Sequence, residues 1–192
     1  MTLHACPDCG AWFPEHPGPV HRYLGASAGC WAMFSAWLVG EGPSGHDLAG
    51  SRPSSAAGVP VDVPQGIESL VMDAYAAQHH GVPSPQAIQS VAVHLLVLHG
   101  VLSRRQSPSR ALWIRQRALR QRGVFHWLTP PADTRAISFR HIFPSGSAPA
   151  CTAADYVASV YESWAHLHRA QLDAWYDAFV DGQPNNPTNR RP

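Results

Sequence analysis

Two cysteines with the spacing Cys-x-x-Cys, followed by a third cysteine, lie within the first thirty residues of this 192-residue chain. The pair is Cys6 and Cys9, in the segment CPDCG at residues 6–10, and the third is Cys30. This spacing allows two thiolates of one turn to bind the same tetrahedral ion, and Gly10 allows the backbone to fold tightly around it. The three cysteines therefore predict a Zn²⁺ site that takes its fourth ligand from elsewhere in the chain.

Two histidines are alternatives for this fourth ligand. His21 lies close in sequence and would complete a short, self-contained knuckle. His79 lies at the end of a predicted helix, and would reach Cys30 if that helix runs antiparallel to one that begins at Cys30. Both versions give a closed four-ligand site, which is typical of a structural metal. Cys151, far from the others, is predicted to be a small buried residue and not a ligand.

The charge balance limits the classes of partner. The 14 basic residues are all arginine, and 13 acidic residues leave the chain almost neutral. This argues against nucleic acid or an anionic membrane as the partner. We identify no apolar run long enough to span a membrane and no basic region followed by an apolar one at the N-terminus, so we expect a cytoplasmic protein. In that reducing compartment, clustered cysteines favour metal binding over disulfides.

Helix signals dominate the chain after Cys30. Apolar residues recur at the spacing of one helix face, Ser84-Pro85 supplies an N-cap and a first-turn proline, and Thr152 begins a capping box that Asp155 completes. The helix that follows Ser84 is apolar on nearly every side and should be central. We therefore expect helices at residues 30–39, 64–80, 84–98, 109–122 and 152–182, and a loop at 124–150 with a short strand pair near 137–139.

These elements predict an all-α fold, a bundle of about five helices with an irregular N-terminal zinc-binding extension. We expect one domain over residues 1–182, in which residues 1–29 form the metal-binding loop and residues 30–182 form the bundle. The segment 43–60 is rich in Pro, Ser, Gly and Ala and is predicted to be a flexible connection. Residues 183–192 are predicted to be a disordered tail.

Three polar side chains in the middle of predicted helices form a second candidate site. Asp73, His94 and His168 lie where an antiparallel bundle would bring them to a common level. Buried polar groups cost free energy unless they are paired or bind a ligand. Together they would hold an open catalytic metal or form a general acid/base pair. The alternative interpretation is a core hydrogen-bond network in which Asp73 fixes the tautomer of a histidine.

Arginine is concentrated in one segment, residues 104–122, where it would form a basic face on a helix. This face would dock an acidic partner or a phosphate, although a charged face is often only solvated. The arginines are Arg104, Arg105, Arg110, Arg115, Arg117, Arg120 and Arg122.

Several longer motifs add a resemblance to a known family. They are CPDCG at residues 6–10, GPVHRYLGAS at 18–27, GCW at 29–31, VMDAYAAQH at 71–79, IQSVAVHL at 88–95 and WLTPP at 127–131, together with Trp164, Ala165 and His168. In these motifs the chain resembles a family of uncharacterised bacterial proteins, of actinobacterial type, described only as a domain of unknown function. The resemblance implies a shared fold and the same metal ligands. The chain departs from that pattern at residues 42–63 and at His80, which we interpret as signs of a specialised role, for example in a biosynthetic pathway.

One primary hypothesis and two alternatives follow. The primary hypothesis is a zinc-binding helical bundle in which the ion pins the N-terminal loop to the bundle, with a small molecule or a protein as its partner. The first alternative is a metal-dependent enzyme of the helical-bundle thiol-transferase or hydrolase type that uses Asp73, His94 and His168. The second is an interaction module that uses the arginine-rich helix 104–122.

Overall fold

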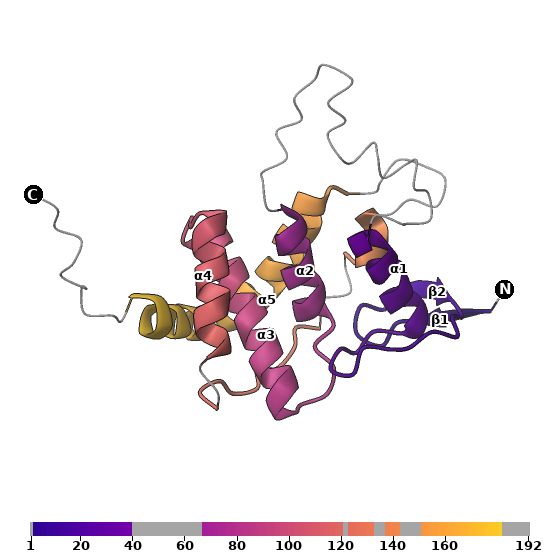
Figure 1. The fold of residues 1–192 in the computed structure, drawn as a ribbon, viewed down its shortest axis with the longest axis horizontal. Coiled ribbons are helices and arrows are strands. Elements are labelled where there is room, and N and C mark those ends of the chain that lie inside the picture. The colour runs from indigo at the N-terminus through magenta and orange to yellow at the C-terminus, as the bar shows by residue number, and fades with distance from the viewer. Residues whose placement is uncertain (1, 40–66, 121–122, 133–136, 143–150, 182–192) are drawn as a thin grey trace, which may run out of the picture.

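The computed structural model describes residues 2–39, 67–120, 123–132, 137–142 and 151–181 of the chain, and this part is predominantly helical (Figure 1). The all-α prediction is therefore confirmed. The elements are β1 (Leu3–Ala5), β2 (Trp12–Pro14), α1 (Ala28–Val39), α2 (Ile67–Gln78), α3 (Pro85–Leu98) with its π-helical extension η2 (His99–Ser103), α4 (Pro108–Leu119), the 3₁₀ turn η3 (Phe139–Ile142), and α5 (Ala153–Tyr176) with its π-helical extension η4 (Asp177–Asp181).

Helix α3 is the central element, as its composition predicted. It packs against α2, α4 and α5, and most of its residues from Val91 onward are buried. By length and composition alone, the helix Pro85–Ser103 could cross a membrane, but 56% of its apolar window is buried inside the fold. Its neighbours identify it as the core helix of the bundle.

Serine and threonine caps set the starts of three helices. The Ser84 hydroxyl accepts the Ala87 N–H at 3.1 Å, with Pro85 in the first turn. A second Ser-Pro pair, Ser107-Pro108, begins α4 in the same way, slightly earlier than the predicted start at residue 109. Thr152 begins α5 with the capping box that the sequence predicted.

The N-terminal segment is more regular than expected. Strands β1 and β2 pair antiparallel, with Leu3 opposite Pro14 and Ala5 opposite Trp12. The prediction of an irregular loop over residues 1–29 is therefore wrong for this part, because three-residue strands are too short to show a period in sequence. The hairpin buries Phe13 against the core and carries the Cys-x-x-Cys segment in its turn.

The predicted strand pair near residues 137–139 is also wrong, because this segment begins the 3₁₀ turn η3. His141 Nδ1 accepts the Ser138 N–H at 2.9 Å, and this local bond closes the turn. The predicted flexible connection, the predicted start of the second helix at Pro64 and the predicted disordered tail all lie outside the described residues.

A cluster of stacked aromatic rings joins α1 to the bundle. The rings of Phe34 and Tyr75 are parallel, with centroids 3.7 Å apart, and Phe139 packs edge-on against both. All three residues are buried. Because Tyr75 lies one turn before His79, this packing brings the start of α1 beside the end of α2, and so positions the metal centre.

Candidate metal centre

The turn of the hairpin presents Cys6 and Cys9 on one side. The Gly10 N–H donates to the Cys6 carbonyl at 2.9 Å, and the Cys6 N–H donates to the Ala11 carbonyl at 2.8 Å. Gly10 has a φ of 70°, in the left-handed region that glycine adopts without strain. The glycine after the second cysteine therefore closes the turn, as its position in the sequence indicated.

Three separate segments meet at this turn and form a group of four metal-binding side chains. Cys6 and Cys9 come from the hairpin, Cys30 from the first turn of α1, and His79 from the residue after α2. Their ligand atoms all lie within 4.8 Å of one another, and all four residues are buried. Ligands of a tetrahedral zinc ion lie about 3.5–3.8 Å apart, given Zn–S and Zn–N bonds of about 2.3 and 2.0 Å. The group therefore has the size and the donor set of such a site.

The histidine is held in the tautomer that a metal requires. His79 Nδ1–H donates to the Tyr75 carbonyl oxygen at 2.9 Å, which leaves the lone pair on Nε2. His79 Nε2 lies 3.3 Å from Cys30 Sγ. The imidazole thus directs its metal-binding nitrogen at the sulfur atoms.

Neighbouring groups also support the sulfur atoms. The Tyr75 hydroxyl lies 3.3 Å from Cys30 Sγ, and the Ser27 N–H donates to Cys6 Sγ at 3.5 Å. Hydrogen bonds of this kind stabilise thiolates and fix their direction. Tyr75, which contacts both Cys30 and His79, was not singled out from the sequence.

The electrostatics of the group favour a bound cation. Hydrogen bonds from Cys30 and Cys9 lower the pKa of Cys6, whereas hydrogen bonds with Cys6 and Cys9, together with burial, raise the pKa of Cys30. Burial is the largest single effect on His79 and lowers its pKa, but the hydrogen bonds with the Cys6 and Cys9 sulfurs and the charge interactions with them together raise the pKa to about 9. Three buried thiols this close cannot ionise together without a compensating positive charge. A divalent ion would supply that charge.

Outside the four ligands, Asp8 joins the hairpin turn to the end of α2. Its carboxylate accepts the Gly81 N–H at 2.8 Å and lies 3.7 Å from His80 Nδ1. The Gly25 N–H donates to the His79 carbonyl at 3.3 Å. Gly25 lies directly against the Asp8 carboxylate, so that a Cβ at this position would collide with it. The turn is thus fixed to α2 by polar contacts independent of the cysteines.

The structure separates the two histidines that the sequence left as alternatives. His79 lies in the group, whereas His21 does not belong to it. The His21 ring packs on Trp31 with centroids 4.9 Å apart, and its Nδ1 accepts the Tyr23 N–H at 3.3 Å. Cys151 is half-buried beside the first turn of α5, and also lies outside the group.

The second predicted constellation is only partly assembled. Asp73 and His94 form a short contact, with 2.6 Å between Oδ1 and Nδ1, and Arg115 contacts the other carboxylate oxygen at 2.6 Å. His168 is not part of this cluster. It lies at a kink in α5, where its Nε2 bonds to the Thr129 carbonyl at 2.8 Å. Among the described residues these side chains form no group of three that could hold a metal ion, which corrects the predicted convergence.

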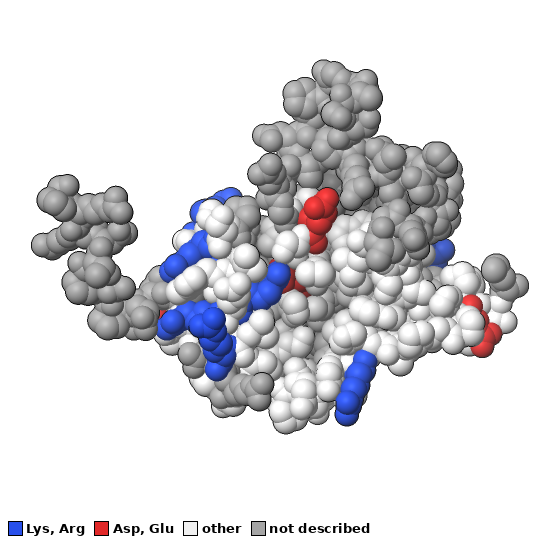
Figure 2. Space-filling view, in the orientation of Figure 1, with Lys and Arg blue, Asp and Glu red and all other residues white. Residues whose placement is uncertain are grey.

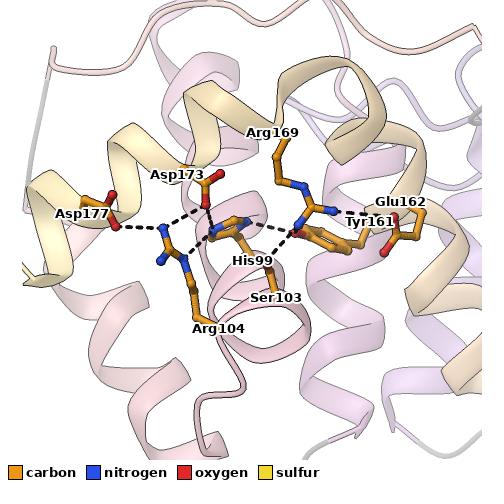
Figure 3. A network of polar contacts seen from close by, with 8 residues as sticks. All are labelled: His99, Ser103, Arg104, Tyr161, Glu162, Arg169, Asp173 and Asp177. Atoms are coloured by element: carbon orange, nitrogen blue, oxygen red, sulfur yellow. Dashed lines mark hydrogen bonds and ion pairs between the residues drawn. The ribbon is translucent and has the colours of Figure 1, made fainter.

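A buried histidine that the sequence analysis did not single out organises a polar network between η2 and α5 (Figure 3). His99 Nδ1 lies 3.0 Å from the Tyr161 hydroxyl, and His99 Nε2 lies 3.1 Å from the Asp173 carboxylate. Arg104 bridges Asp173 and Asp177 at 2.9 Å each. Burial lowers the pKa of His99. Both ring nitrogens are occupied, so this network has a structural role in fixing α5.

The arginine-rich segment divides between internal and outer contacts. Arg104 and Arg115 belong to the ion pairs just described, which corrects their assignment to a single outer face. Figure 2 shows arginine side chains gathered over the surface where α4 lies. The Arg110 guanidinium lies 3.7 Å from the centre of the Trp113 ring, and Arg117 lies 5.4 Å from it. Arg122 is outside the described residues.

Comparison with known proteins decides the family. Residues 61–178, more than half of the chain, match the sequence profile of the Family of unknown function (DUF5946). The chain belongs to this family. The segment that matches DUF5946 contains α2 to α5 and His79, whereas Cys6, Cys9 and Cys30 precede it. No curated protein and no solved structure matches the chain significantly.

Proposed function

We propose that the protein binds one Zn²⁺ ion through Cys6, Cys9, Cys30 and His79, and that the ion holds the N-terminal hairpin on the helical bundle. The observation that carries this proposal is the meeting of four buried ligand atoms within 4.8 Å of one another. Three sulfur atoms and one imidazole nitrogen suit zinc better than the hard cations Mg²⁺ and Ca²⁺, which prefer oxygen.

The burial of the site favours a structural ion over a catalytic one. A catalytic zinc keeps an open position for water or substrate, whereas four protein ligands close the coordination sphere. All four residues are at most 1% exposed, so a substrate has no access to the ion. Zinc binding would contribute directly to folding, because the unfolded chain has no preformed site.

The ion joins two parts of the chain that the family comparison separates. Its histidine comes from the segment that matches DUF5946, and its cysteines come from the hairpin and α1. A reducing compartment such as the cytoplasm would keep these thiols available for the metal. We therefore propose that the functional surface of the protein lies on the helical bundle, and that zinc attaches the N-terminal hairpin to this bundle.

Metal analysis of the purified protein tests this proposal. We expect about one zinc per chain after expression without added metal. The Cys9→Ser variant should lose the ion together with the cooperative unfolding transition of the wild-type protein. A wild-type protein that folds and contains no zinc would refute the proposal.

We also propose a second role, as an interaction module that docks an acidic polypeptide on α4. The observation that favours it is that Leu112 and Leu119, each 53% exposed, lie on a helix that also carries arginines without an acidic partner among the described residues. Arg110 and Arg120 make no ion pair with any described residue. Because Arg110 covers the face of Trp113, that ring is less available to stack on a nucleic acid base, which favours a protein partner.

Binding of poly-glutamate at increasing salt concentration tests the α4 surface. We expect binding that weakens as salt rises, since exposed charges are screened. The double variant Arg110→Gln, Arg120→Gln should weaken it, whereas Arg22→Gln, an exposed arginine on the N-terminal segment, should leave it unchanged. Equal binding by the two variants would exclude α4 as the docking surface.

A further inference from the structure

Asp73 is a buried carboxylate in the middle of α2 that the metal centre does not use. Its side chain is fully buried. An ionised carboxylate is tolerated there only because two donors reach it, His94 from α3 and Arg115 from α4, each at 2.6 Å. The three side chains thus join three helices at one point.

The hydrogen bond to Asp73 fixes the tautomer of His94. An ionised carboxylate can only accept hydrogen bonds, so His94 Nδ1 carries the proton and donates it. In the neutral imidazole, Nε2 then has the free lone pair. Among the described residues no group bonds to His94 Nε2, and 21% of the side chain is exposed. The ring therefore holds a basic nitrogen that has no partner in the described part of the chain and belongs to a side chain that solvent reaches.

This arrangement distinguishes His94 from the two fully buried histidines of the bundle, His79 and His99. His99 is fully buried and has contacts on both ring nitrogens. His79 has its second nitrogen against the cysteine sulfurs. A histidine whose only role was to satisfy a buried carboxylate would be expected in a closed environment like that of His99. His94 instead combines an orienting carboxylate with an unoccupied, solvent-accessible base.

Arg115 completes the constellation. Its positive charge compensates the negative charge of the buried Asp73 carboxylate, which also contacts His94. Arg115 Nη2 donates to both Asp73 and the Ser69 hydroxyl, whereas its Nη1 bonds to no group in the part of the chain that the structure describes. The guanidinium therefore retains a donor for an anion.

We propose that Asp73 and His94 form a general-base dyad that takes a proton from a small weak acid, whose conjugate anion is stabilised by Arg115. In this step the X–H bond of the substrate breaks, the proton forms a bond to His94 Nε2, and the electron pair remains on X. The resulting imidazolium donates to the Asp73 carboxylate through Nδ1–H. His94 is the catalytic residue, and Asp73 is a positioning residue that acts through it. This proposal is independent of the zinc centre.

Base-catalysed ring opening of nitrobenzisoxazole tests the proposal without knowledge of the natural substrate. The base removes the hydrogen on the ring carbon, the C–H electrons form a nitrile, and the N–O bond breaks to give a coloured cyano-nitrophenolate. The matched variant is His94→Asn, because its amide can still donate to Asp73 but has no basic nitrogen at the position of Nε2. We expect His94→Asn to lower kcat/KM at least tenfold and to retain the wild-type melting temperature. His168→Asn, outside the cluster, should keep the wild-type rate.

A wild-type rate no faster than that of His94→Asn would overturn the proposal, whether or not the variant loses stability. Nitrogen NMR of the histidine side chains tests the role of Asp73 separately. We expect the Nδ1–H tautomer of His94 in the wild-type protein, and a mixture of both tautomers in Asp73→Asn. An Nε2–H tautomer in the wild-type protein would exclude the dyad.

Discussion

Cys30 Sγ lies 3.3 Å from His79 Nε2, although the two residues are 49 positions apart in the chain. This contact joins the start of α1 to the end of α2, and Cys6 and Cys9 of the hairpin meet it at the same point. None of the three segments positions these side chains by local structure alone. The geometry of the site is therefore a property of the folded chain, and ion binding and folding should be coupled.

Cys30→Ser should remove the ion and destabilise the protein, whereas Cys151→Ser should do neither. Both variants replace one sulfur by oxygen, but only Cys30 belongs to the four-residue group. A structural zinc contributes about 10–16 kcal/mol in small zinc peptides, comparable to the whole stability of a domain. We expect Cys30→Ser, like Cys9→Ser, to lose the zinc and the cooperative unfolding transition, measured by metal analysis and calorimetry. Equal zinc content in the two variants would contradict the assignment of Cys30.

His79→Asn should remove the zinc, whereas His21→Asn should leave about one ion per chain. Asparagine at position 79 can still donate to the Tyr75 carbonyl but has no nitrogen at the position of Nε2. The His21 ring packs on Trp31 and not on the cysteine sulfurs. Zinc titration of the two metal-free proteins compares these ligands directly. Loss of zinc in His21→Asn alone would instead identify His21 as the fourth ligand.

The helical part of the fold was predictable because its signals are local. Ser84-Pro85 and the Thr152 capping box mark helix starts through contacts within four residues, and both predictions are confirmed. The hairpin was missed because its strands are three residues long. Residues 137–139 were misjudged because a β-favouring Ile-Ser-Phe sequence is overridden by the local bond from Ser138 to His141.

The candidate site was predictable only in its ligands. The spacing of the three cysteines indicated a metal, and the antiparallel arrangement of two helices brought His79 into consideration. No sequence pattern indicated the supporting roles of Tyr75 and Arg115, because both roles depend on contacts between different helices. The prediction for His168 failed for the same reason. Its mid-helix position suggested that it would meet Asp73, but it lies at the kink of α5 and its Nε2 bonds to the Thr129 carbonyl.

Arg115→Met should destabilise the protein far more than Arg120→Met. Removal of the Arg115 guanidinium leaves the fully buried Asp73 carboxylate with His94 as its one remaining partner among the described residues. Removal of one member of a buried ion pair typically costs about 3–5 kcal/mol, because the remaining charge stays buried. Arg120 is exposed and has no ion pair with the described residues, so its loss should change the free energy of unfolding by less than about 0.5 kcal/mol. Urea unfolding of both variants measures the difference, and equal values would show that Asp73 does not depend on Arg115.

His99 should make the stability of the protein fall as the solution becomes acidic. Burial lowers the pKa of His99 below its ordinary value of 6.5, and the positive charges of Arg104 and Arg169 act in the same direction against the opposing effect of Asp173. Below about pH 6.5 the unfolded chain therefore binds a proton at this position that the folded protein does not, and unfolding becomes more favourable. The stabilising contribution of His99 is fully present above that pH. It is lost as the pH falls through the pKa that His99 has in the folded protein.

The His99→Gln variant isolates this effect. It should be less stable than the wild-type protein at about pH 8, because it loses the bonds to Tyr161 and Asp173, but this difference in the free energy of unfolding should shrink by about pH 5.5. The other histidines and the metal centre are common to both proteins, so their titration cancels in the difference. Denaturant unfolding across this pH range gives the measurement. A difference that stays constant or grows as the pH falls would mean that His99 is charged in the folded protein.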